Sequence, residues 1–256
     1  MITYEGTRDK ESWQDIVNID EPELSSTLIF KEIPTKQKGY IVVRRCLQHF
    51  RERLEDMVNL MLQRGAAHVY VTVSDHVEFR SEEAVNTGKH IFIYDSDMDR
   101  LQVELSHHAI VDEQHDLLNY ERLNADNSSL FIELYNDCFH YVPNSATYTM
   151  EDAVRISSSN SDLAWILRHE ADPVGICEVC CDSDIPEIAS IGICAPFRGM
   201  GLGHAAMKQI LHSLWKMGHR QATLTVSSAN PRAYQLYRAL HFERMHTLTR
   251  WYRSAN

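Results

Sequence analysis

The stretch CAPFRGMGLGHAAM, residues 194–207, places three glycines at alternate positions behind an arginine. The short, isoleucine-rich segment 187–194 before it predicts a buried strand. Residues 222–226 alternate apolar side chains with threonines and predict a second strand. Between them, apolar residues recur at helical spacing until Gly218, where the helix should end: Leu202, Ala206, Ile210, Leu214 and Met217. The glycines therefore belong to a turn between a strand and a helix.

A turn of this kind can hold a diphosphate, because it directs several backbone N–H groups to one point and the helix start adds partial positive charge. Side chains at Gly199, Gly201 and Gly203 would block the diphosphate or require a positive φ. A P-loop is rejected, since the stretch ends Gly-His-Ala instead of Gly-Lys-Ser/Thr. A Rossmann fingerprint fits poorly, because the spacing is G-x-G-x-G and no acidic residue ends the second strand. A tight turn without a ligand is the alternative.

The flanking residues predict a mixed α+β domain over residues 119–256. Two helices and two strands are expected before the glycine turn, at 128–139, 149–159, 162–170 and 172–181. Thr149 is a candidate cap for the second of these helices. Asn230 caps a short helix that starts at Pro231, and residues 247–253 alternate as a last strand.

The first half, residues 1–105, carries a weaker copy of the same strand–helix–strand unit. GYIVVRRC (39–46) and HVYVTVS (68–74) predict its strands. The helix between them should end at Gly65, with an apolar stripe made by Leu47, Phe50, Leu54, Val58 and Met61. Where the second copy has glycines, the first has the bulky side chains Arg44, Arg45 and Cys46. We therefore expect this copy to keep the scaffold and to close the equivalent site.

Residues 106–118 are polar, show no clear period and predict a linker between two domains. His107 and His108 lie in it, but adjacent histidines point in different directions on any regular element, so solvated linker residues are favoured over metal ligands. The sequence CEVCC (177–181) contains one C-x-x-C pair, which supplies at most half of a tetrahedral zinc site. Its apolar surroundings favour cysteines that act as small buried side chains. No metal is expected.

Composition restricts the class of protein. The chain has 256 residues, 44% hydrophobic and 24% charged, with a formal net charge of −11. This acidity argues against a nucleic-acid binder, which needs a basic face, and favours a cationic partner. Neither a signal peptide nor an apolar run of membrane-spanning length is present, so we expect a cytoplasmic protein without a membrane partner.

Two motifs in the second half resemble the GNAT-type N-acetyltransferase superfamily. RGMGLG, from Arg198 to Gly203, is similar to its R/Q-x-x-G-x-G/A motif. SSANPRAYQLYRALHFERM (227–245) is similar to a family pattern of Asn, Ala, Leu-Tyr and Gly-Phe, matched by Asn230, Ala233, Leu236-Tyr237 and Phe242. The resemblance covers about residues 119–256 and makes the first half a degenerate relative of the same fold. One departure is His241 in place of the usual glycine, at a helix end that often needs left-handed geometry.

The resemblance implies that acetyl-CoA is the co-substrate. Its pantetheine arm would pair with a strand backbone where two strands splay apart, at Ile191, Gly192 and Ile193. Its pyrophosphate would accept hydrogen bonds from the backbone of Arg198, Gly199, Met200, Gly201, Leu202 and Gly203. Asn230 would lie on the pantetheine side, and three nearby cations could offset the cofactor's charge: Lys208, Arg232 and Arg238.

The implied reaction moves the acetyl group to a primary amine of a small molecule or protein, by direct attack in a ternary complex. The amine must lose a proton, and Glu187 is the first candidate for the base because some histone-acetylating members have a Glu at this place; Glu178 is the second. Tyr237 is the candidate acid for the departing thiolate. The structural alternatives are a surface charge for Glu187 and a core aromatic for Tyr237. A non-catalytic acetyl-CoA-binding or protein-interaction module is the other functional class, and a homodimer is one assembly compatible with the sequence.

Overall fold

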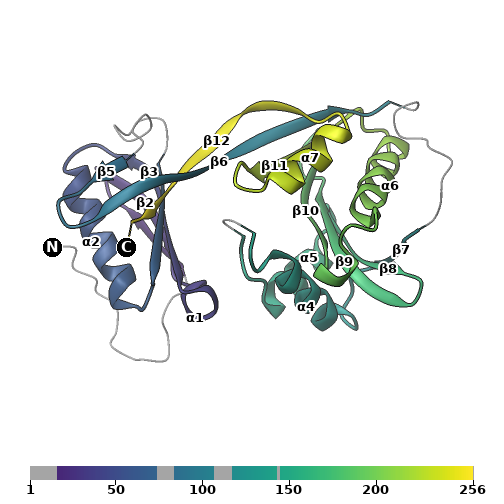
Figure 1. Ribbon diagram of the computed structural model, residues 1–256, viewed down its shortest axis with the longest axis horizontal. Helices are drawn as coiled ribbons and strands as arrows, with labels where there is room; N and C mark the ends of the chain where they lie inside the picture. Colours follow the sequence, from purple (N-terminus) through teal and green to yellow (C-terminus); the bar gives the residue numbers. More distant parts are fainter. Residues whose placement is uncertain (1–15, 74–83, 107–116, 143–144, 256) are drawn as a thin grey trace. The chain divides into compact units, whose positions relative to one another are not determined.

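The computed structural model describes residues 16–73, 84–106, 117–142 and 145–255. They form a mixed α+β fold with two compact units (Figure 1). The first unit comprises Met1–Met98 and Thr247–Asn256, and the second comprises Asp99–His246. Two long strands, β6 (Ile91–Glu104) and β12 (Glu243–Ser254), contribute residues to both units. None of the described helices is long and apolar enough to cross a membrane.

The first unit contains the predicted strand–helix–strand copy. Strands β3 (Lys38–Cys46) and β4 (His68–Val73) pair in parallel, and α2 (Phe50–Gln63) connects them. The remaining elements were not predicted: β1 (Ile16–Asp20), β2 (Leu24–Ile29), α1 (Ile33–Lys36), β5 (Ala84–Asn86) and β6. The end of β12 pairs antiparallel with β4, from Arg250↔Val73 to Arg253↔Tyr70.

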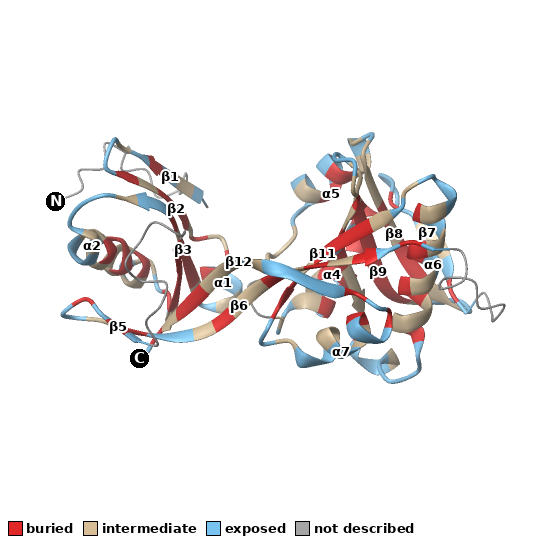
Figure 2. Ribbon diagram, turned by 90° about the horizontal axis from the view of Figure 1, so that it is seen from above, coloured by how far each residue is buried: buried red, intermediate tan, exposed pale blue. Residues whose placement is uncertain are grey.

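Helix α2 packs its apolar stripe onto one face of this sheet, as the buried colouring of Figure 2 shows. Leu54, Val58 and Met61 are buried there as the spacing predicts. The prediction was wrong for Leu47, which is 65% exposed and lies before the helix. The physical reason is local: His49, the N-cap, has φ 53°, so the chain turns there and the helix begins only at Phe50.

The second unit is built on a sheet with the strand order β6-β11-β10-β9-β8-β7. The pairs β7–β8, β8–β9 and β9–β10 are antiparallel, and β10–β11 is parallel. The strands are β7 (Asn119–Arg122), β8 (Asp162–His169), β9 (Asp172–Cys180), β10 (Glu187–Ile193) and β11 (Gln221–Ser227). The helices are α4 (Ser128–Phe139), α5 (Met150–Ser158), α6 (Leu202–Lys216) and α7 (Pro231–Ala239).

Helices cover both faces of this sheet. Helices α6 and α7 pack on one face over Cys177, Val179 and Leu224, whereas α4 and α5 pack on the other over Ala164 and Ile176. Because β9 is enclosed on both faces, its sequence is apolar almost throughout, as a doubly covered strand requires.

Most of the predicted helix ends are confirmed. The carboxylate of Asp152 accepts the N–H of Thr149 at 3.0 Å, which caps α5. His241 has φ 63°, the left-handed geometry expected after α7. Met217 does not join the buried stripe of α6: it is 56% exposed at the C-cap, one position before Gly218, whose φ of 100° ends the helix.

Candidate functional site

Strands β10 and β11 separate soon after they begin to pair. Their parallel register contains only Glu187↔Thr223 and Ile188↔Leu224. On its other side β10 stays paired with β9 as far as Ile193↔Gly175, with a bulge between Ile188 and Ser190. Within the described residues, the backbone of Ile191–Ile193 therefore has a strand partner only on the β9 side. A second extended chain could pair with the other side.

Gly192 places the end of β10 close to α4. A Cβ atom there would lie 2.7 Å from Cβ of Cys138 and 2.9 Å from the ring of Phe139. Any larger residue would therefore push the strand and the helix apart. The glycine is needed for this close approach, which is a requirement that the sequence pattern alone did not reveal.

The loop after β10 has the bare backbone that the sequence predicts. Gly199 and Gly201 have φ of 85° and 80°, and a Cβ at either would meet no atom within 4 Å. These two glycines therefore serve the left-handed backbone and leave open space beside it. Gly203 differs, since a Cβ there would make ordinary contacts of 3.7 Å with Ile193 and 3.8 Å with Leu236.

The backbone N–H groups of residues 199–203 donate to no protein acceptor among the described residues. Gly201 is the N-cap of α6, and its carbonyl accepts the N–H groups of His204 and Ala205. The unpaired donors thus lie at a helix start, where the macrodipole adds partial positive charge. This arrangement suits an anion that can accept several hydrogen bonds at once.

Arg198 has a second role that was not predicted. Its Nε donates to the carbonyl of Ile193 at 2.8 Å, and its Nη2 donates to the carbonyl of Cys138 at 3.4 Å. The side chain thus fixes the start of the loop to the end of β10 and to α4, while its backbone belongs to the loop.

Asn230 and Tyr237 lie on α7. The side-chain oxygen of Asn230 accepts the N–H of Ala233 at 3.2 Å and so caps the helix. Tyr237 is 8% exposed in the core beneath α6 and α7, with its ring 5.8 Å from that of Phe242. Burial, with a smaller contribution from Cys177, raises the pKa of Tyr237 to about 12, so the phenol keeps its proton at neutral pH.

Glu187 lies at the first of the two paired positions of β10 and β11, just before the strands part, and its carboxylate contacts several polar groups of the sheet. Its Oε2 is 3.1 Å from Nη2 of Arg100, and its Oε1 accepts the hydroxyl of Thr225 at 3.0 Å. The same guanidinium donates to Thr223 at 3.0 Å. Arg100 was not identified from the sequence, because it lies 87 residues before Glu187 and no local pattern connects the two.

Glu178 occupies a different environment. It is 5% exposed, and the hydroxyl of Tyr148 donates to its Oε2 at 2.8 Å. Burial raises the pKa of this carboxyl above its ordinary value, and the Tyr148 hydrogen bond only partly opposes the shift. Tyr148 is itself held by stacking on Tyr135, at 3.5 Å between ring centroids, and by two backbone hydrogen bonds with the Asn136 amide.

The C-x-x-C pair does not converge on one site. Cys177 is fully buried against the α6 and α7 side of β9, where burial raises its pKa. Cys180 lies three residues further along the strand, so it points to the other face, and its thiol donates to Asp182 at 3.4 Å. His107 and His108 lie outside the described residues.

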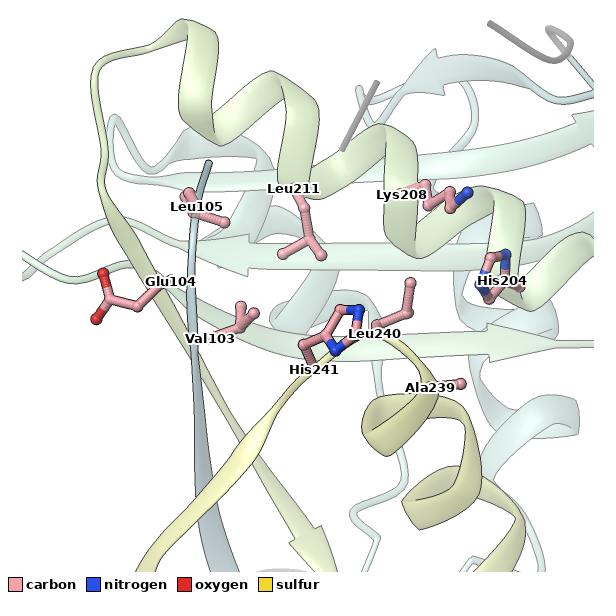
Figure 3. Close-up of a pocket in the computed structure, with 9 residues that line it drawn as sticks. All are labelled: Val103, Glu104, Leu105, His204, Lys208, Leu211, Ala239, Leu240 and His241. Carbon is pink, nitrogen blue, oxygen red and sulfur yellow. The ribbon is translucent and has the colours of Figure 1, made fainter. Parts of the chain in front are cut away.

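A pocket of about 190 Å³ lies beside the start of α6 (Figure 3). His204 and Lys208 enter it from α6, and His241 enters from the second residue after α7. Glu104 and five apolar residues complete its lining. Lys208 is thus one of three basic side chains at this pocket, whereas Arg232 and Arg238 are exposed on α7.

Comparison with known proteins agrees with this geometry. Residues 128–242 match the model of the acetyltransferase (GNAT) family. No curated protein matched the sequence. Among solved structures, a functionally unknown conserved protein from Staphylococcus epidermidis has a TM-score of 0.61 at 13% identity, with 96% of this chain and 95% of that chain covered. A GCN5-related N-acetyltransferase from Sphaerobacter thermophilus has a TM-score of 0.60 at 14% identity, with 94% and 80% covered. A GCN5-related N-acetyltransferase from Kribbella flavida has a TM-score of 0.54 at 13% identity, with 93% and 90% covered.

Proposed function

Because residues 128–242 form a GNAT acetyltransferase domain, we propose that this protein transfers an acetyl group from acetyl-CoA to a primary amine, by direct attack in a ternary complex. One observation supports this most: unpaired N–H groups at the start of α6 follow directly on a strand whose backbone is open on one side. The first feature suits a pyrophosphate, and the second suits an amide-bearing arm that pairs like a strand.

In this proposal the pantetheine arm pairs with Ile191–Ile193, and the pyrophosphate accepts hydrogen bonds from residues 199–203. Arg198, which the motif also suggested, is left out because its backbone N–H donates to the carbonyl of Ala195 at 3.3 Å. Asn230 supports the pantetheine side indirectly, by fixing the start of α7 at the end of β11. Of the basic side chains of the pocket in Figure 3, His204 directly follows the loop and Lys208 lies one helical turn further along α6, which places them well for the phosphorylated nucleotide end of the cofactor. Lys208 contributes the permanent charge among them.

Tyr237 is proposed as the acid that protonates the departing thiolate. A phenol that keeps its proton at neutral pH can supply it as the C–S bond breaks. The uncharged amine is the nucleophile that attacks the thioester, and the proton it loses must pass to a carboxylate or to water. Glu187 is the proposed acceptor of that proton because it lies in the short paired stretch just before β10 and β11 part.

Glu178 is the alternative base. Burial makes Glu178 hold a proton more tightly, whereas Glu187 lies 3.1 Å from the guanidinium of Arg100. The net charge of −11 favours a cationic amine as the acceptor.

The test has two parts. Isothermal titration should show one equivalent of acetyl-CoA binding to the chain, and a mass-spectrometric screen of pooled small amines and peptides should reveal an acetylated product that depends on the protein. Binding without any acetylated product across broad pools would favour the non-catalytic module. Absence of binding by a folded sample would contradict the proposal.

A further inference from the structure

Two cysteines far apart in the sequence meet beside the cofactor loop. Cys138 in the last turn of α4 and Cys194 directly after β10 are separated by 56 residues, yet their Sγ atoms are 3.5 Å apart and share a hydrogen bond. They are only 5% and 6% exposed, within the apolar cluster beneath α4. A disulfide bond is about 2.05 Å long, so two sulfurs already in contact need to approach by only about 1.5 Å to form one.

We propose that Cys138 and Cys194 form a redox-active dithiol, which a hydroperoxide oxidises to an intramolecular disulfide. The thiolate of Cys194 attacks the terminal peroxide oxygen and becomes a sulfenic acid, while the O–O bond breaks and the alcohol or water leaves. The Cys138 sulfur then attacks the sulfenic sulfur and water leaves. In sum, two thiols and one hydroperoxide give one disulfide, one water and one alcohol, or a second water when the oxidant is hydrogen peroxide.

The local contacts assign the two steps to the two residues. The hydrogen bond from Cys138 lowers the pKa of Cys194, whereas that shared bond and burial raise the pKa of Cys138. Cys194 is therefore the thiolate that attacks first, and Cys138 is the resolving thiol. Burial and the Asp137 carboxylate oppose this lowering of the Cys194 pKa, and the charge of Arg198, whose guanidinium donates to the backbone of Cys138, adds a smaller favourable contribution.

Oxidation would act on the cofactor loop through Arg198. This residue opens the loop, and its side chain holds the carbonyls of both Ile193 and Cys138. Drawing Cys138 and Cys194 together must shift these anchor points, because Gly192 already leaves no free space between β10 and α4. This coupling rests on the proposed acetyl-CoA site, whereas formation of the disulfide does not.

The experiment treats the reduced protein with hydrogen peroxide, digests it and maps thiols by mass spectrometry. We expect one cross-link between the peptides that contain Cys138 and Cys194, reversed by dithiothreitol and absent from both C138S and C194S. Cys177 and Cys180 are the matched internal control: they lie only three residues apart, but their side chains point to opposite faces of β9 and should not cross-link. Because the parent protein carries the main readout, poor folding of a variant does not remove the test.

Three results would overturn the proposal. One is oxidation of Cys46, Cys180 or Cys181 while Cys138 and Cys194 stay free. Another is oxidation of Cys194 to a sulfinic acid without a cross-link. The third is retention of a zinc ion by Cys138, Cys194 and Asp137, whose ligand atoms lie within 4.8 Å of one another.

Titration with acetyl-CoA tests the coupling. We expect the affinity to be about tenfold weaker in the oxidised protein, and therefore a midpoint potential about 30 mV higher when acetyl-CoA is saturating. Equal affinities of the two forms would overturn the coupling. If the reduced protein binds no acetyl-CoA, the proposed function fails, and the cross-link still decides whether the dithiol is redox-active.

Discussion

The two strand–helix–strand copies share one scaffold but differ at the place where a ligand would enter. In the first unit β3 and β4 pair at six positions, from Lys38↔His68 to Val43↔Val73. In the second, β10 and β11 pair at only two. The first copy is thus closed by its own hydrogen bonds. In the second copy β10 and β11 part after Ile188, which leaves one side of the backbone of Ile191–Ile193 without a strand partner and so makes room for a ligand.

The turns before α2 and α6 also share their backbone geometry and differ in the side chain at the N-cap. His49 before α2 and Gly201 before α6 are both N-caps with left-handed backbone, at φ 53° and 80°. The fold therefore demands this geometry in both copies, and only the second meets it with a residue that leaves the space beside it open. In the first copy Arg44 donates to Thr27 at 2.7 Å and Arg45 to the carbonyl of Glu21 at 3.1 Å, so these side chains bind β2 and the turn before it.

The largest expected effect comes from filling the loop of the second copy. Gly201→Val should abolish acetyl-CoA binding, because it places a side chain beside the unpaired N–H groups. Gly218→Val is the matched control: Gly218 also has positive φ and open space, but it lies at the other end of α6. Both variants should lose about 1–2 kcal/mol of stability from the strained backbone. Titration calorimetry and thermal melts separate the two effects, and parent-like affinity in Gly201→Val would disprove the loop assignment.

The next largest effect is expected at Tyr237, the buried tyrosine in the core beneath α6 and α7. Tyr237→Phe keeps the ring and should lower turnover by about 10²- to 10⁴-fold with little change in acetyl-CoA affinity. Tyr120→Phe is the control, since Tyr120 is a partly buried tyrosine packed against the same core, and its hydroxyl donates to the carbonyl of Ala206 at 3.2 Å. It should lose stability and keep its rate. If a folded Tyr237→Phe variant turns over as fast as the parent, Tyr237 is not the acid and serves only as a core residue.

Substitution of the two candidate bases, Glu187 and Glu178, should have a smaller effect and shows which carboxylate accepts the proton of the amine. Glu187→Gln should lower turnover by about 10²-fold, the lower end for loss of a general base, while acetyl-CoA affinity holds. A larger loss in Glu178→Gln would instead assign the base to the residue with the raised pKa. Rates measured against pH with the acceptor found in the amine screen distinguish the two.

Glu178→Gln also has a pH signature in stability. Because burial raises the pKa of Glu178, the folded protein binds its proton more tightly than the unfolded chain, and the parent should lose stability relative to the variant as pH rises above about 4.5. Glu121 is the opposite case: hydrogen bonds from Asn127 and Arg168 lower its pKa, so the parent should lose stability relative to Glu121→Gln as pH falls. Denaturant titrations over pH measure both, and parallel curves would contradict them.

The features that the sequence predicted well are those that depend on neighbouring residues. The helix after the glycines, its end at Gly218 and the cap of α5 follow from spacing, turn chemistry and capping within a few positions. The shared scaffold of the two copies was visible because β4 and β11 follow their helices after similar turns. These signals act over one or two turns of chain, so a single sequence contains them.

The missing features depend on partners distant in the chain. Strand β6 was overlooked because three aspartates, Asp95, Asp97 and Asp99, interrupt its middle and apolar residues alternate clearly only near its end. The contact of Arg100 with Glu187 follows from the order of strands in the sheet, and the meeting of Cys138 with Cys194 follows from the packing of α4 on that sheet; local patterns specify neither. The C-x-x-C motif shows the same limit: its two thiols are close in sequence but lie on opposite faces of one strand, whereas the two thiols that meet are 56 residues apart.

The smallest expected effect is the sharpest test of the comparison between the two copies. His49→Gly gives the first copy the bare N-cap of the second. Glycine relieves a left-handed strain of about 1–2 kcal/mol but adds about 0.5–1 kcal/mol of unfolded-chain entropy, and the exposed His49–Glu52 contact is lost, so stability should change little. No second equivalent of acetyl-CoA should bind, because β3 and β4 remain paired through Val43↔Val73 and offer no open backbone. Titration calorimetry of His49→Gly measures how many equivalents of acetyl-CoA bind. Two equivalents would show that a glycine N-cap alone makes a site, whereas one equivalent indicates that the strands must also part.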